Sequence, residues 1–521
     1  MTYLFASNIA VSNEVEIKND INSPIPVSDG GGSLTVDGTL SISSLPEVEI
    51  KNDAGNPVPI SDAGGSLTVD GTVAVSSLPE IEIKNDTGNP VPISDAGGSL
   101  TIDGTVAVSS LPEVEIKNDA GNPIGVILPA TNHDAFGRLR VSNPFTLFDS
   151  FHRYQDNGKV NEFVSGNASS AHDSNAGSII MTVGTASGDR IYRESSRVFA
   201  YQPGKSLLIL QTFCMSPGKT GLRQRQGYFD TNNGVYIEQD GLDLYLVRRS
   251  SSTGSIVETR IPQSQWNIDP LTGSGPSSIT LDITKTQILW WDIEWLGVGS
   301  VRSGFVIDGK FIQTHSFHHA NIITIPYMTT ACLPVRAELE NTASTNSSSS
   351  YRVICTSVIS EGGYELRGRP FNVSHPISTP YNLATTATLY PIMSIRLKSN
   401  RAGAIVVPKT FSISVADAGN FRYHVISGAT TSGGAWVSAG TNSCVEYKSN
   451  ATSYTGGTIL NTAYLISTNQ AAGAPSAAEF PFKYQLERNT FTNTMYEFTL
   501  AIESDAVNTD VYAHINWEEI T

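Results

Sequence analysis

The chain has 521 residues and a net charge of −16, and only 16% of its residues are charged. Because Gly, Ser, Thr, Asn and Val are abundant, this composition is typical of a turn-rich, all-β protein. The acidic balance argues against binding nucleic acid, which needs clustered Lys and Arg. We find no apolar run of 18 residues and no basic leader followed by an apolar core. We therefore expect no membrane insertion, and synthesis and folding in a cytoplasm.

A 33-residue repeat occupies the first part of the chain. The heptapeptide E-[VI]-E-I-K-N-D begins at Glu14, Glu47, Glu80 and Glu113, and the unit is complete three times before the fourth copy ends at Pro123. Each copy contains short apolar–polar alternations between turn residues, which predict strands. One copy has too few aliphatic side chains to offset the ordering of 33 residues, so copies must pack against each other or against other chains.

Residues 1–126 are therefore predicted to form an attachment region and a shaft. The shaft is either a β-solenoid within one chain or a structure wound from several chains, most often three. We favour the second alternative, which makes the protein a homotrimer. The repeats contain no His, Cys, Arg or aromatic residue, so we expect no chemistry from them.

The rest of the chain is predicted to consist of a connector (127–150), a β-sandwich body (151–367) and a C-terminal β-domain (368–521). Strand patterns recur every 8–15 residues in the body, a spacing that is typical of a sandwich or jelly roll. The Asp-Gly pairs at 240–241 and 308–309 predict hairpin turns. The predicted fold class is all-β, with an N-terminal 33-residue β-repeat shaft followed by two β-sandwich or jelly-roll-like domains.

Three motifs carry a resemblance to a known group of proteins: V-E-I-K-N-D-x-G-N-P-V-P, D-A-F-G-R-L-R-V-S-N-P-F-T-L-F-D and G-Y-F-D-T-N-N-G-V-Y-I-E-Q-D-G. They resemble virion structural proteins of tailed bacteriophages, including cyanophages. The resemblance implies a particle component located in the virion, with other virion proteins as partners and no enzymatic activity. It favours a trimeric tail or baseplate fibre that binds a host-surface glycan. The alternatives are a capsid decoration or head fibre protein and a polysaccharide depolymerase tailspike.

No sequence motif predicts catalysis or a cofactor, since G-x-S-x-G, G-x-x-x-x-G-K-[ST] and H-E-x-x-H are all absent. A His cluster is formed by His315, His318 and His319. Strand alternation places His315 and His318 on opposite faces, so the three imidazoles cannot face one ion without a bend. We favour a solvated strand end. The alternative is a metal site in which His side chains of three chains meet on a three-fold axis.

A Trp-rich run is the best candidate for glycan contact. Period-2 alternation places Trp291 and Trp295 on one face, which we predict to be core. The other face carries Trp290, Asp292 and Glu294. We favour a solvated edge there. A glycan-binding surface with a Trp beside two carboxylates and a carboxylate pair for glycoside hydrolysis remain as alternatives.

Cysteine and arginine residues complete the set of candidates. The four cysteines, Cys214, Cys332, Cys355 and Cys444, lack metal-ligand spacing and are predicted to be buried free thiols. A Cys332–Cys355 bridge is the alternative. A group of arginines is predicted to pair with nearby acidic residues rather than to form a basic patch; it comprises Arg223, Arg225, Arg248 and Arg249.

Overall fold

The computed structural model describes residues 143–365, 367–468 and 484–520, residues 133, 134 and 139, and the backbone of five short strands. Those strands are β1 (Ala10–Val11), β2 (Thr35–Val36), β3 (Leu100–Thr101), β4 (Asn118–Pro123) and β28 (Ser476–Glu479). The chain divides into two compact units, Met1–Leu128 and Pro129–Thr521. In the first unit β1 pairs with β4, and β2 with β3. The remainder of the predicted shaft lies outside the described residues.

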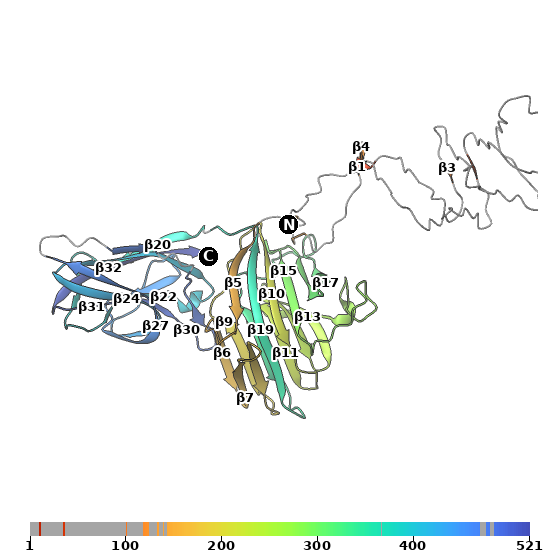
Figure 1. Cartoon of the computed structure of the whole chain (residues 1–521), viewed down its shortest axis with the longest axis horizontal. Coiled ribbons are helices and arrows are strands. Elements are labelled where there is room, and N and C mark those ends of the chain that lie inside the picture. Colours follow the sequence, from red (N-terminus) through yellow and green to blue (C-terminus); the bar gives the residue numbers. More distant parts are fainter. Residues whose placement is uncertain are drawn as a thin grey trace, which may run out of the picture. The chain divides into compact units, whose positions relative to one another are not determined.

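The body is a sandwich of two antiparallel sheets (Figure 1). The eight-stranded sheet has the order β17-β16-β15-β10-β19-β8-β7, with β5 also paired to β19. Its strands are β5 (Phe145–Phe151), β7 (Ala168–Asp173), β8 (Ser178–Val183), β10 (Ser206–Cys214), β15 (Gln287–Ile293), β16 (Val301–Ile307), β17 (Lys310–Phe317) and β19 (Ser349–Glu361). β5 begins within the range predicted as connector, because it completes the sheet beside β19.

The seven-stranded sheet of the body has the order β14-β13-β12-β11-β18-β9-β6. Its strands are β6 (Val160–Ser165), β9 (Arg190–Ser195), β11 (Leu222–Phe229), β12 (Gly234–Asp240), β13 (Asp243–Ser250), β14 (Val257–Pro262) and β18 (Val335–Asn341). The inner faces of the two sheets meet in one apolar core that includes Ile209, Ile237, Trp291 and Leu339. Each large apolar side chain buried there stabilises the fold by about 1.5–3 kcal/mol.

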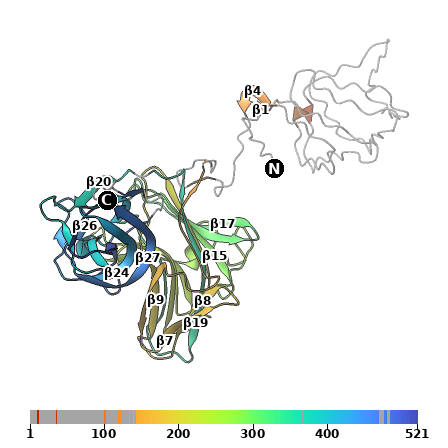
Figure 2. The same cartoon turned by 60° about the vertical axis from the view of Figure 1, so that its left-hand side comes forward.

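The C-terminal part forms a second group of strands, coloured from teal (β20) to blue (β32) in Figures 1 and 2. One sheet has the order β20-β32-β23-β28 with β21 beside β32, and the other has the order β25-β26-β22-β31-β24-β27. A short hairpin, β29-β30, follows β28. The strands are β20 (Arg369–Ser374), β21 (Tyr381–Leu383), β22 (Tyr390–Leu397), β23 (Ile405–Val415), β24 (Gly419–Ser432), β25 (Val437–Ser438), β26 (Val445–Lys448), β27 (Ser453–Ser467), β29 (Arg488–Asn489), β30 (Thr494–Met495), β31 (Glu497–Ser504) and β32 (Thr509–Ile520).

Side-chain periodicity explains why these segments are strands. In β32 every second residue is buried, from Thr509 to Glu519, and the residues between them are partly exposed. This is the pattern of a strand with one face in the core. The buried set includes Ile515 and Trp517, which belong to the C-terminal core. The prediction of an all-β fold is confirmed.

The two predicted hairpin turns are also confirmed. β12 and β13 are joined at Asp240–Asp243, and β16 and β17 at Ile307–Lys310. In the second turn Asp308 and Gly309 both have positive φ, 51° and 73°. This conformation matches the right-handed twist of a two-residue hairpin, and Asp-Gly tolerates it well.

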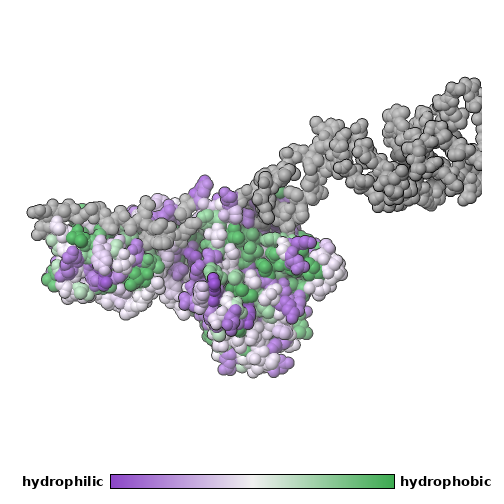
Figure 3. Space-filling view, viewed as in Figure 1, coloured by the Kyte–Doolittle hydropathy of each residue, from purple (hydrophilic) through white to green (hydrophobic). Residues whose placement is uncertain are grey.

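The outer face of the eight-stranded sheet is partly apolar. Figure 3 shows hydrophobic side chains gathered over the region of β10, β15 and β17. The strand register places Phe151, Cys355, Thr212 and Ile288 in one row across β5, β19, β10 and β15, so their side chains share this face. Phe151 is 56% exposed. No helix in the described part of the chain is long and apolar enough to cross a bilayer; its helical segments are two 3-10 turns, Gln263–Gln265 and Ser399–Arg401.

Candidate functional site

The structure does not bring Trp290, Asp292 and Glu294 to one accessible surface. Trp290 and Asp292 project from β15 on the outer side of the eight-stranded sheet, but they are only 2% and 0% exposed. The indole of Trp290 packs against the Phe311 ring, with 5.8 Å between ring centroids, and lies so close to Gly304 that an added Cβ would meet it at 2.7 Å. The prediction of a solvated edge is therefore wrong for these two residues, and a sugar ring has no access to Trp290 in this arrangement.

The two carboxylates of this run have separate local roles. Asp292 forms an ion pair with Arg302, its cross-strand neighbour on β16, and Arg302 also donates a hydrogen bond to the carbonyl of His133 at 2.5 Å. Glu294 lies beyond the end of β15, where its carboxylate accepts a hydrogen bond from the backbone N–H of Ser300 at 3.3 Å. Burial raises the pKa of Glu294. The carboxylate of Asp292 is therefore held in an ion pair, and the carboxylates of Asp292 and Glu294 do not form an accessible catalytic pair.

The three histidines are held apart by different partners. His315 Nδ1 accepts the backbone N–H of Asn267 at 3.2 Å, and His319 Nδ1 donates to the carbonyl of Gly299 at 2.5 Å. His318 is exposed and lies 3.1 Å from the hydroxyl of Ser300. Within the described residues no group of three or more His, Cys, Asp or Glu side chains could hold a metal ion. The three imidazoles of the His315–His319 segment contact different groups, and the segment is mostly buried rather than solvated as predicted.

The four thiols are free. Burial raises the pKa of each. Cys444 is buried, Cys214 and Cys332 are half-buried and Cys355 is exposed, so the prediction of buried thiols is wrong for Cys355. The alternative bridge between Cys332 and Cys355 does not form.

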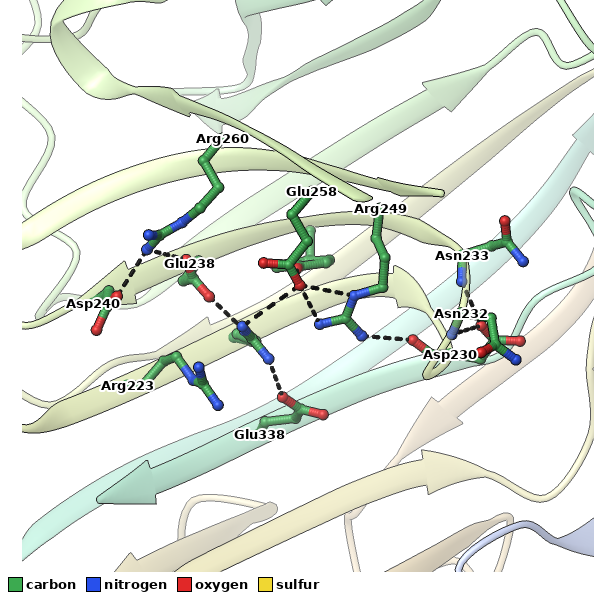
Figure 4. Close-up of polar contacts among 12 residues, drawn as sticks. Arg223, Asp230, Asn232, Asn233, Glu238, Asp240, Arg249, Glu258, Arg260 and Glu338 are labelled. Carbon is green, nitrogen blue, oxygen red and sulfur yellow. Dashed lines mark hydrogen bonds and ion pairs between the residues drawn. The ribbon is translucent and has the colours of Figure 1, made fainter. Parts of the chain in front are cut away.

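A charged network lies on the outer face of the seven-stranded sheet of the body (Figure 4). Sequence reasoning had identified only some of its arginines. The network joins strands β9, β11, β12, β13, β14 and β18 through Glu194, Arg225, Glu238, Asp240, Arg249, Glu258, Arg260, Arg336 and Glu338, and a separate pair on the same face is formed by Arg223 and Glu340. We call this group the charged face.

Arg225 and Glu338 occupy the centre of the charged face. The Arg225 guanidinium contacts Glu238 at 2.6 Å and Glu338 at 3.1 Å, and the second oxygen of Glu338 accepts from Arg336 at 2.7 Å. Arg336 in turn reaches Glu194 at 2.8 Å. Burial alone raises the pKa of Glu338, but the charges of Arg336 and Arg225 outweigh it and hold that pKa below its usual value. Each charge is neutralised by a neighbour, so the charged face holds strands together and leaves no charge at its centre for a ligand.

Aromatic rings support these guanidinium groups. Arg249 lies over the rings of Phe229 and Tyr236, at 5.5 and 5.0 Å from their centroids, and Arg260 lies 4.2 Å from that of Tyr245. Cations stacked on rings keep favourable electrostatic contacts while they cover apolar surface. This explains how charged side chains can be nearly inaccessible on the outside of a sheet. The predicted pairing of Arg223, Arg225 and Arg249 with acidic residues is confirmed, whereas Arg248 donates to the Thr259 hydroxyl.

The C-terminal sandwich is anchored to one end of the charged face. Arg488 lies 3.7 Å from Glu194 and donates to the carbonyl of Ser195 at 3.2 Å. The hydroxyl of Thr490 donates to Glu194 at 2.7 Å. The β29-β30 hairpin therefore connects the two sandwiches through polar contacts that sequence reasoning did not find, because the partners are about 300 residues apart.

We expect Tyr496→Phe to lower the free energy of unfolding by about 1 kcal/mol, the usual contribution of a part-buried hydrogen bond. The Tyr496 hydroxyl donates to Asn161 Oδ1 at 2.7 Å, and Asn161 donates to the carbonyl of Arg488 at 2.7 Å. Urea unfolding measures the change. Tyr154→Phe is the matched control, because Tyr154 is 79% exposed. Equal stabilities of the two variants would contradict a role for this contact.

No protein-family model matches the chain, and no curated protein matches it. It is similar to solved structures at low identity. One is a protein of unknown function from Shewanella oneidensis MR-1 (10% identity, 46% of this chain and 98% of that chain, TM-score 0.29). Another is the Emp47p carbohydrate recognition domain (10%, 41% and 94%, 0.27). A third is a Bacteroides ovatus mixed-linkage glucan GH16 protein (9%, 41% and 99%, 0.28). Likenesses at this level carry no argument about what this chain binds or does.

Proposed function

We propose that this protein is a structural, non-enzymatic component of a tailed-bacteriophage virion. The observation that carries the proposal is the joining, in one chain, of 33-residue repeats to two antiparallel sandwiches. In the first of these sandwiches the central charges of the charged face neutralise one another. The resemblance of the repeat and body motifs to virion proteins supports it. The repeats act as a shaft, and the sandwiches are the part that the shaft holds away from the particle.

The shaft makes a homotrimer the favoured assembly, because single copies of the repeat cannot bury their own apolar faces. The row of Phe151 and Ile288 on the outer face of the eight-stranded sheet supports contact between protein chains, since exposed apolar patches commonly mark interfaces. Light scattering of the purified chain tests the assembly. A mass near three times 55.8 kDa is expected, whereas a mass near 55.8 kDa would exclude the trimer and favour a solenoid.

Within the virion we favour a tail or baseplate fibre that binds a host-surface glycan, with weak binding by single copies strengthened by multivalency. Immunogold electron microscopy of intact particles, with an antibody against residues 368–521, tests this position. Label at the tail or along fibres is expected. Label over the head would instead identify a capsid decoration or head fibre protein. If the particles carry no label and the chain is also absent from the proteins of purified particles, the virion role is excluded.

The depolymerase alternative requires an accessible carboxylate pair. The burial of Asp292 and its ion pair with Arg302 weigh against a pair with Glu294. Incubation of host envelope polysaccharide with the purified protein should release no reducing sugar. Release that is abolished by Glu294→Gln would establish the enzyme and overturn the structural proposal.

A further inference from the structure

A pocket of about 570 Å³ lies where the charged face meets the C-terminal sandwich. The body contributes the turn Asp230–Asn232 and the side of Arg336, and the C-terminal sandwich contributes Arg401, Arg488 and Phe491. This is large enough for a sugar unit, because ligand pockets commonly measure about 300–1,000 Å³. The pocket is separate from the Trp290 run and from the histidine segment.

The deep wall of the pocket is built from buried charged groups that are held rigidly. Arg336 and Arg488 are 6% and 3% exposed, and both contact Glu194. Arg336 is further fixed by Glu338 and lies 5.3 Å from the centroid of the Phe491 ring. The Nε atom of Arg488 is buried and has no hydrogen-bond partner among the described residues. This wall therefore combines two rigidly held arginines, which already contact Glu194, with an aromatic ring.

Arg401 differs from the other two arginines of the pocket. It ends the 3-10 turn Ser399–Arg401, is exposed, and pairs with no acidic side chain in the part of the chain that the structure describes. Its guanidinium thus adds to the pocket a positive charge outside any ion pair among the described residues, while Arg336 pairs with Glu194 and Glu338 and Arg488 lies 3.7 Å from Glu194. A guanidinium with free donors binds carboxylates in a bidentate manner.

Neutral polar groups also line the pocket. The lining residues Thr231, Asn232 and Thr330 come from the body. One oxygen of the Asp230 carboxylate, Oδ1, accepts the backbone N–H groups of Asn232 and Asn233, as the right-hand side of Figure 4 shows, and this carboxylate adds a negative charge to the lining. Hydroxyl and amide groups beside an aromatic ring suit the hydroxyls and the apolar face of a sugar.

We infer that this pocket binds a carboxylated saccharide unit, with the carboxylate on Arg401 and the sugar ring against Phe491. The inference rests on the host-surface binding part of the proposed function, for which it names the ligand class and the site. Because the walls come from both sandwiches, the bound sugar also contacts both of them. A single site is expected to be weak, and several copies in an assembly raise the avidity.

Titration of the full-length protein with 3′-sialyllactose, trigalacturonic acid and lactose, followed by calorimetry or saturation-transfer NMR, tests the inference. At least one carboxylated probe is expected to bind, and lactose to bind at least tenfold more weakly. Arg401→Ala is expected to weaken binding of the carboxylated probe about tenfold, the effect of losing a charged hydrogen bond. Arg153→Ala is the matched control, because Arg153 is an exposed arginine of the body outside the pocket.

Three results would overturn the inference: no binding of either carboxylated probe at about 10 mM, equal binding of lactose, or unchanged binding by the Arg401→Ala protein. Arg401 is exposed, so its replacement is not expected to disturb folding. The virion proposal is tested separately by immunogold labelling. Failure of the titration would leave the location of the protein in the particle standing, and failure of the labelling would leave the sugar site standing.

Discussion

Replacement of Glu338 by Ala is expected to lower the free energy of unfolding by about 3–5 kcal/mol, the effect of removing one partner from a buried ion pair. The side chain of Glu338 is only 5% exposed, and its two oxygens accept from Arg225 and Arg336. Its removal takes one carboxylate partner from each of two guanidinium groups, those of Arg225 and Arg336, in a site that excludes water. Because β11 and β18 are adjacent strands of one sheet, the loss also weakens the link between them.

Urea unfolding followed by Trp fluorescence measures this effect, since four of the six Trp residues belong to the body. Asp149→Ala is the matched control, because Asp149 is 61% exposed in its pair with Lys159 and such surface pairs contribute about 1 kcal/mol or less. A Glu338→Ala protein as stable as the Asp149→Ala protein would show that the charged face does not stabilise the body.

The charged face also shows what the sequence could not predict. Arg225 is 13 residues from Glu238 and 113 residues from Glu338, and only the strand order β12-β11-β18 makes both of them its neighbours. Local pattern suggested that the arginines pair with acidic residues, but it could not identify the partners. Register between distant strands depends on the whole topology, which one sequence does not reveal.

The sequence predicts those features of the structure that depend on residues close together in the chain. The hairpin turns at Asp240-Gly241 and Asp308-Gly309 and the strand positions were readable, because turn chemistry and period-2 alternation act over a few residues. Alternation also placed Trp290 and Asp292 on the face opposite Trp291. It could not show that this face is covered, because the cover comes from Phe311 on β17 and from the ion pair with Arg302. Periodicity predicts the face of the sheet on which a side chain lies, whereas the burial of that side chain depends on what packs against the face.

We expect the stability of the protein to fall as the pH is lowered from about 6.5 towards 4, and His315 and His319 to cause part of this loss. Burial lowers the pKa of each imidazole to about 4, so both stay neutral in the folded chain. In the unfolded chain the pKa is about 6.5, so below that pH the unfolded state binds protons that the folded state does not bind. Stability is therefore fully present above pH 6.5 and decreases by up to ~1.4 kcal/mol per pH unit for each histidine.

The hydrogen bonds explain why the folded protein resists protonation of these rings. His315 uses Nδ1 as an acceptor for Asn267, which a protonated nitrogen cannot do. His319 donates from Nδ1 to Gly299 and stacks on Tyr327 at 3.9 Å, and its Nε2 is buried without a hydrogen-bond partner among the described residues. A second proton on His319 would place an unsatisfied N–H and a charge in that apolar site.

Urea unfolding of the native protein and of the His315→Gln/His319→Gln double variant at pH 7 and pH 5 tests this expectation. The native protein is expected to lose on the order of 4 kcal/mol more than the double variant between these values, about 2 kcal/mol for each imidazole, because the glutamines do not titrate. The comparison ends at pH 5 because the lowered pKa of Glu338 means that its ion pairs are lost only at a more acidic pH. His318→Gln, which replaces the exposed histidine of the same segment, is the matched control for the substitution itself. A double variant with the same pH dependence as the native protein would show that neither buried imidazole limits stability in acid, and the loss would then have to come from other groups.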